Sequence, residues 1–112
     1  MSRPIFSLTQ ARELLPQLKL LTADAVIRAE AVSAELQQLS EADPAHAQLT
    51  AALREIVDNW AEAVRALGLE AKGLWLVDFD NGEGYYCWKY PEAAIAHYHG
   101  YDDGFAGRIP IQ

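Results

Sequence analysis

The stretch LWLVDFDNGEGYYCWKY, residues 74–90, decides the fold of this 112-residue chain. Two short runs rich in aromatic and β-branched residues, 74–79 and 85–90, flank the segment DNGEG at 80–84. Asn-Gly between two such runs is a strong signal for a β-hairpin. The sequence therefore predicts an antiparallel pair of strands in the C-terminal part of the chain.

The alternation of side chains along these two runs gives the hairpin two different faces. A two-residue turn at Asn81 and Gly82 would place Val77 opposite Tyr86. One face would then be apolar, and it would hold Trp75, Val77, Phe79, Tyr86, Trp88 and Tyr90. The other face would carry a mixed set, and we expect a polar site there, among Leu74, Leu76, Asp78, Tyr85, Cys87 and Lys89.

The next stretch, residues 91–99, is ambiguous between strand and helix. Pro91 followed by alanines favours a helix, whereas Ile95, His97 and His99 alternate with other residues as in a strand. Because an isolated two-stranded hairpin is marginal in water, we expect a third antiparallel strand that ends near His99.

Two amphipathic helices precede the hairpin. Apolar residues recur at spacings of three and four from Leu8 to Leu39, and again from Leu49 to Leu67, with turn formers at 40–44 between them. This pattern predicts two antiparallel helices that share a coiled-coil-like seam.

The helix ends and one irregularity are also visible in the sequence. Ser7 and Gln10 have the spacing of a capping box, and Gly68 is typical of a helix C-terminus. Pro16 lies inside the first helix, so we expect a kink there, or a short helix joined to a longer one.

These elements together predict an α+β fold. A single domain, 1–112, would consist of a long antiparallel helical hairpin, 7–68, followed by a small antiparallel β-sheet of two to three strands with a glycine-rich tail, 73–112. The apolar stripes are wider than a two-helix seam needs, which favours a homodimer through the helix faces.

Composition narrows the classes of function. The net charge of −7 includes no basic patch, so we expect no binding to nucleic acid or to an anionic membrane. The only cysteine, Cys87, excludes an internal disulfide, and the N-terminal residues lack the apolar run of a signal peptide. We expect a cytoplasmic protein.

The stretch HYHGYDDGFAGR, residues 97–108, holds the candidate metal ligands. His97 and His99 would share one face of a strand, and Asp102 and Asp103 follow closely. Imidazole and carboxylate groups suit zinc, and Cys87 or Asp78 could complete such a site. The alternative is that His99 is a hydrogen-bonded packing residue and that His97 is exposed.

The same stretch also predicts a lock for the C-terminal tail. We expect the Arg108 guanidinium to pair with the Asp78 carboxylate, while Gly104 and Gly107 allow a tight turn. Alternatively, this turn and Arg108 would bind a small anionic ligand. Lys89 lies on the same mixed face.

Several of these residues match a pattern seen elsewhere. The combination of Lys72, Val77-Asp78-Phe79, Cys87-Trp88-Lys89, His99 and Gly104-Phe105-Ala106-Gly107-Arg108 with Pro110 resembles the prokaryotic domain of unknown function 2203 family. The resemblance spans nearly the whole chain, and it implies no activity, because members of that family carry none that can be transferred.

The sequence leaves two classes of function open, and it identifies no catalytic residues. The first is a non-catalytic dimeric interaction or assembly module, for which we expect no cofactor. The alternative is a divalent-metal-binding protein or a metal-dependent hydrolase, with zinc at the C-terminal sheet and tail.

Overall fold

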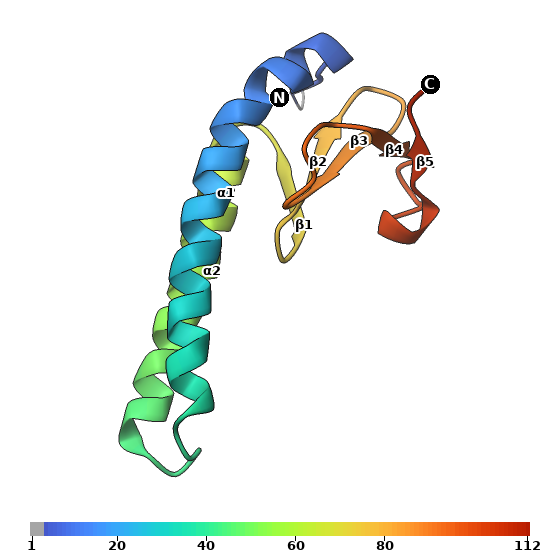
Figure 1. The fold of residues 1–112 in the computed structure, drawn as a ribbon. Coiled ribbons are helices and arrows are strands. Elements are labelled where there is room, and N and C mark those ends of the chain that lie inside the picture. The colour runs from blue at the N-terminus through green and yellow to red at the C-terminus, as the bar shows by residue number, and fades with distance from the viewer. Residues whose placement is uncertain (1–3) are drawn as a thin grey trace.

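A helical hairpin carries a five-stranded antiparallel sheet along one end (Figure 1). The structure is a computed structural model that describes residues 4–112. The far end of the hairpin, where the two helices are joined, extends well beyond the sheet. The α+β class predicted from the sequence is confirmed.

The first helix, α1, spans Leu8–Gln37 and begins with the predicted capping box. The Ser7 side chain accepts a hydrogen bond from the Gln10 N–H, and the Gln10 side chain accepts one from the Ser7 N–H. Pro16 lies inside this helix, which continues through it as one element. The first turns of α1 are bent away from the axis of the rest, as expected for an internal proline (Figure 1).

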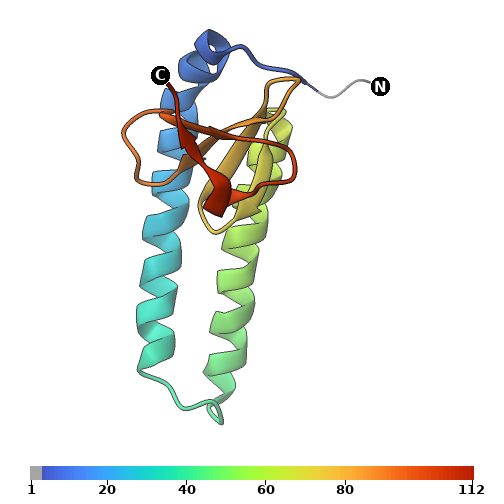
Figure 2. The same ribbon diagram turned by 90° about the vertical axis from the view of Figure 1, so that its right-hand side faces the viewer.

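The second helix, α2, spans Pro44–Ala66 and runs antiparallel to α1 (Figure 2). Asp43 caps its N-terminus by accepting a hydrogen bond from the Ala45 N–H. The chain leaves α2 through Gly68, whose φ of 86° favours glycine at this position. Both ends therefore follow the local signals in the sequence.

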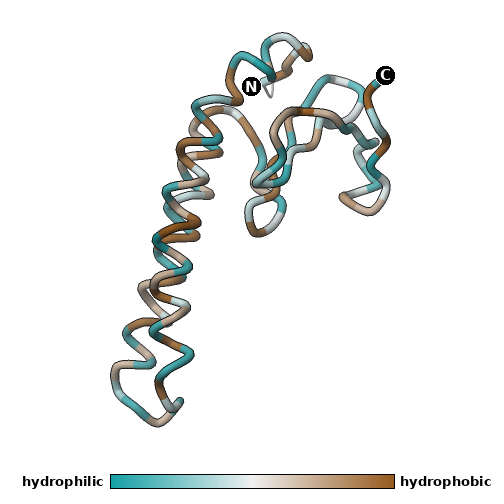
Figure 3. Tube along the Cα trace, in the orientation of Figure 1, coloured by the Kyte–Doolittle hydropathy of each residue, from teal (hydrophilic) through white to brown (hydrophobic). Residues whose placement is uncertain are grey.

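The two helices pack together, and their buried positions match the predicted spacing well on α1 and only in part on α2, where Trp60 and Val64 are buried. Hydrophobic and hydrophilic residues alternate along both helices (Figure 3). The seam is packed most tightly beside the sheet, where Trp60 donates a hydrogen bond of 2.9 Å from its indole N–H to the Thr22 hydroxyl. The buried positions of α1 include much of the expected repeat: Ala11, Leu15, Leu18, Thr22, Ala25 and Ala29.

The sheet has five strands rather than the expected two to three. In chain order and in spatial order these are β1 (Glu70–Gly73), β2 (Leu76–Asp80), β3 (Tyr85–Lys89), β4 (His97–His99) and β5 (Ile109–Pro110). The third predicted strand exists as β4, which is only three residues long. The added edge strands, β1 and β5, are short, and neither has an alternating apolar pattern.

The expected register of the central hairpin is wrong by two residues. Val77 pairs with Trp88 rather than with Tyr86, because the loop between β2 and β3 contains four residues, 81–84. Side chains close this loop: Asp80 accepts a hydrogen bond from the Gly82 N–H, and Asn81 accepts from Glu83 and Gly84. A shift of two preserves the side-chain alternation, so the two predicted faces are correct.

The inner face of the sheet packs on the helices and forms the core. Val77, Phe79 and Trp88 are fully buried there, together with Ile95 from the segment between β3 and β4. Trp75, at the turn between β1 and β2, packs edge-on against Trp60 of α2 with ring centroids 5.0 Å apart. The polar residues of the same strands therefore point to the outer face.

No helix within residues 4–112 is both long and apolar enough to cross a membrane.

Candidate functional site

The outer face of the sheet holds a buried cluster of three polar side chains. Asp78 lies on β2, directly opposite Cys87 on β3, and His99 lies on the neighbouring strand β4. All three side chains point away from the helices, and their exposed fractions are between 0% and 3%. Their potential metal-ligand atoms all lie within 4.8 Å of one another. Within residues 4–112, this is the one group of three or more histidine, cysteine or acidic residues that could hold a metal ion.

Two hydrogen-bonding partners fix the orientation of the His99 ring. Nδ1 lies 2.7 Å from the backbone oxygen of Gly100, and Nε2 lies 3.2 Å and 3.1 Å from the two oxygens of Asp78. A carbonyl oxygen can only accept, so Nδ1 carries a hydrogen and donates it. Nε2 is therefore the nitrogen that faces Asp78 and the centre of the cluster.

Asp78 is a carboxylate in a poorly hydrated place. Burial raises its pKa, while the hydrogen bonds from His99 and Cys87 act in the opposite direction and only partly offset that effect. A positive charge close to the cluster would therefore stabilise the ionised form of Asp78.

Cys87 is a free, buried thiol, and it is protonated at neutral pH. Burial raises its pKa to about 12, and the nearby Asp78 carboxylate acts in the same direction. Such a thiol is a poor nucleophile, because only the thiolate attacks. The cluster therefore does not have the electrostatics of a cysteine-dependent enzyme.

The tail is locked to the sheet, but by a different carboxylate from the expected one. Arg108 donates two hydrogen bonds to Glu92, of 3.0 Å and 2.8 Å, and not to Asp78. Glu92 is placed for this role by the turn after β3, where its side chain also accepts a hydrogen bond from the Lys89 N–H. His99 occupies the position at Asp78 that we expected Arg108 to fill.

Arg108 also contacts one member of the cluster, Cys87. One guanidinium nitrogen lies 3.9 Å from the Cys87 sulfur, and the guanidinium packs on the Phe105 ring at 4.4 Å. The Lys89 ammonium nitrogen also lies over this ring, 5.2 Å from its centroid. Because both of its terminal nitrogens contact Glu92, Arg108 is directed inward rather than toward an external anion.

The four predicted metal ligands near the C-terminus do not all lie together. Asp102 is exposed, and Asp103 accepts a hydrogen bond of 3.1 Å from the Gly100 N–H. Neither belongs to the ligand cluster, and neither does His97, so the metal set His97, His99, Asp102 and Asp103 is not brought together as a group. Of these four residues, His99 alone joins the cluster, with Asp78 and Cys87.

Gly104 and Gly107 shape the turn around Asp103. Gly104 has a φ of 65°, in the region that favours glycine, and it precedes the short 3₁₀ helix η1 (Phe105–Gly107). A Cβ on Gly107 would lie 2.7 Å from the Cβ of Asp103. The two glycines therefore have a structural role in bringing Arg108 back to the sheet.

Sequence reasoning did not identify Glu92 and Gly100 as part of the site. Glu92 stands in a turn after Pro91, and Gly100 contributes only a backbone oxygen. The one available signal was the position of an acid close to the end of a predicted strand, and it does not identify a partner.

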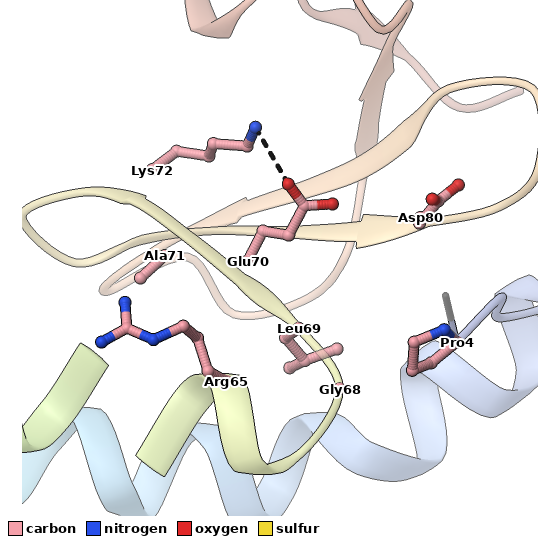
Figure 4. Close-up of a pocket in the computed structure, with 8 residues that line it drawn as sticks. All are labelled: Pro4, Arg65, Gly68, Leu69, Glu70, Ala71, Lys72 and Asp80. Carbon is pink, nitrogen blue, oxygen red and sulfur yellow. Dashed lines mark ion pairs between the residues drawn. The ribbon is translucent and has the colours of Figure 1, made fainter. Parts of the chain in front are cut away.

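A separate hollow of about 460 Å³ lies between the end of α2 and β1 (Figure 4). Its charged groups have both signs and have partners in the chain: Lys72 pairs with Glu70 at 3.1 Å, and Arg65 pairs with Glu62 at 3.2 Å. Asp80, at its edge, accepts a hydrogen bond of 2.6 Å from the Tyr101 hydroxyl. The hollow therefore favours neither cations nor anions, whereas the buried Asp78 carboxylate makes the cluster on the outer face favour a cation.

Comparisons with known proteins identify a family but not an activity. The model of a family described as "Uncharacterized conserved protein (DUF2203)" matches residues 4–111. No curated protein and no solved structure matches the chain.

The contact between Glu92 and Arg108 makes a testable contribution to stability. Although burial raises the pKa of Glu92, the hydrogen bonds from Arg108 and from the Lys89 N–H outweigh it and hold the pKa below its ordinary value of 4.5. The stabilisation is therefore complete above pH 4.5 and is lost as the pH falls through the lowered folded value.

We expect Glu92→Gln to lower the free energy of unfolding by about 1–2 kcal/mol near neutral pH, since it removes a charge-assisted pair. Urea unfolding at a series of pH values measures this, with Glu83→Gln in the exposed β2–β3 loop as the control. The gap between wild type and Glu92→Gln closes in acid. A gap that stays constant down to about pH 3 would contradict an electrostatic origin.

Proposed function

The chain belongs to the DUF2203 family of uncharacterized conserved proteins, and from the geometry of its outer sheet face we propose that it binds a thiophilic divalent metal ion. The ligands are Asp78, Cys87 and His99, and zinc is the ion that best suits them. The orientation of the His99 ring carries this proposal.

Metal-binding histidines usually donate their second ring N–H to a carbonyl or carboxylate, which fixes the tautomer and aims the other nitrogen at the metal. His99 has this arrangement, because Nδ1 donates to the Gly100 oxygen and Nε2 faces the cluster. The ring therefore needs no reorientation to present a lone pair to an ion beside Asp78 and Cys87.

The types of donor select the class of metal. One sulfur, one imidazole nitrogen and one carboxylate oxygen form a set that zinc accepts, whereas magnesium and calcium prefer oxygen ligands alone. Zinc would replace the thiol proton and the hydrogen between Asp78 and His99. The charge of the ion would then balance the carboxylate and the thiolate in a place that water reaches poorly.

Metal titration of purified, chelator-treated protein tests the proposal. We expect one Zn²⁺ or Co²⁺ per chain, and the Co²⁺ form should show a sulfur-to-metal charge-transfer band from Cys87. Cys87→Ser and His99→Gln should each weaken binding by about 100-fold or more, since loss of even an outer-shell partner costs 10–100-fold. His46→Gln, which alters a histidine on α2, is the matched control and should bind as wild type does.

Two outcomes would contradict the proposal. One is a wild-type protein, folded by circular dichroism, that binds neither ion. The other is binding that survives both site variants unchanged, which would place the metal elsewhere.

We also propose self-association, because one observation on α1 favours an assembly role. Leu20 and Ile27 lie seven residues apart on one face of the helix, and they are 75% and 68% exposed. Asp24 and Arg28 lie beside them. In an antiparallel pair of α1 helices related by a two-fold axis, the acid of one copy would approach the base of the other, and the four helices would form a bundle.

Sedimentation equilibrium over a range of concentrations measures this association. We expect a dimer that dissociates in the double variant Leu20→Gln and Ile27→Gln, because the apolar face is lost. Leu74→Gln, which changes an exposed leucine at the turn between β1 and β2, should leave the dimer intact. A wild-type protein that is monomeric at all concentrations would exclude self-association and would leave the metal proposal unaffected.

A further inference from the structure

We propose that His97 is the fourth protein ligand of the metal site, so that the bound ion has no open coordination position. This inference rests on the proposed metal binding at Asp78, Cys87 and His99. It decides between a structural metal site and a catalytic one.

An unsatisfied nitrogen is the observation behind this proposal. Among the side chains described, Nδ1 of His97 is the buried polar atom that has no hydrogen-bond partner. Native proteins satisfy nearly all such atoms, and an exception is often explained by an ion or a ligand. The lone pair of a ring nitrogen is a donor that zinc accepts.

The position of His97 in the sheet places it beside the cluster. His97 on β4 pairs directly with Cys87 on β3, which itself pairs with Asp78 on β2. Side chains directly opposite each other in an antiparallel sheet share a face, with Cβ atoms about 5 Å apart. His97 and His99, two residues apart, also share that face. An ion bound to the Cys87 sulfur would therefore have His97 directly across on β4 and His99 two residues further along the same strand.

The His97 ring must turn to complete the site, because its nitrogens lie outside the group of ligand atoms that are within 4.8 Å of one another. In this structure, one guanidinium nitrogen of Arg108 lies 3.9 Å from the Cys87 sulfur. A dication bound to that sulfur would repel the guanidinium, which stays anchored to Glu92 through two hydrogen bonds. Withdrawal of Arg108 from the sulfur leaves the space beside Cys87 to His97.

With four protein ligands, the site would be a structural metal site rather than a catalytic one. Structural zinc sites are usually tetrahedral with four protein ligands, whereas catalytic sites keep a position for water or substrate. Asp78, Cys87 and the two histidines would join β2, β3 and β4 through one ion. The metal would then stabilise the folded sheet in proportion to its affinity, and no water would be activated.

Cobalt-substituted protein provides the test, with added imidazole as a probe for an open position. We expect the wild-type Co²⁺ spectrum to be that of a tetrahedral ion and to be unchanged by imidazole. His97→Ala and His97→Phe should each bind Co²⁺ about 10- to 100-fold more weakly, keep the charge-transfer band of Cys87, and change their visible spectrum when imidazole fills the vacant position. His97→Phe keeps the volume of the ring without its nitrogens.

The outcomes separate this inference from the proposal on which it depends. If wild type binds no metal, the metal proposal itself fails, and the inference fails with it. If wild type binds Co²⁺ through Cys87 but takes up imidazole, the site has an open position and the fourth ligand is not His97. Unchanged affinity and spectrum in both His97 variants would overturn the inference in the same way. The wild-type measurement with imidazole decides the question even if a variant fails to fold.

Discussion

The position of β3 between β2 and β4 is the constraint on which the rest of the structure depends. Trp88 and its partner Val77 point toward the helices, so the adjacent pair, Cys87 and Asp78, must point away from them. A slip of one residue would exchange the two faces and would place an acid against α1 and α2. The burial of the apolar face therefore also determines which polar residues meet on the outer one.

The buried polar cluster is costly for a chain of this size. An acid, a thiol and an imidazole are removed from water on the face opposite the main core, and Arg108, packed on Phe105, contacts the thiol. Apolar residues of similar volume would serve packing at least as well. The proposed metal binding would account for the presence of these groups, for their orientation and for the unsatisfied nitrogen of His97.

Much of the fold can be predicted from local sequence patterns, such as capping residues and the spacing of apolar side chains. The capping box at Ser7, the seam of the helices and the alternation along 74–90 each predict a feature that the structure contains. The strand count and the register could not be obtained in this way. β1 and β5 are too short for a periodic pattern, and the four-residue loop depends on hydrogen bonds from the Asp80 and Asn81 side chains.

The site was predicted residue by residue rather than as a group. Asp78, Cys87 and His99 were each candidates, but the predicted set was built on the two histidines with Asp102 and Asp103, and Cys87 or Asp78 was expected only to complete it. The cluster seen in the structure depends on which residues of β2 and β4 lie beside Cys87, and the strand register determines this. The partner of Arg108 was missed for the same reason, since Glu92 is fixed by the turn after β3.

X-ray absorption at the zinc edge of zinc-loaded protein tests the central claim most directly, because it reports the atoms bound to the metal. The account predicts one sulfur at about 2.3 Å, with nitrogen and oxygen ligands at about 2.0–2.2 Å. A shell of nitrogen and oxygen atoms without sulfur would contradict it, because Cys87 lies at the centre of the proposed site and is the only cysteine in the chain.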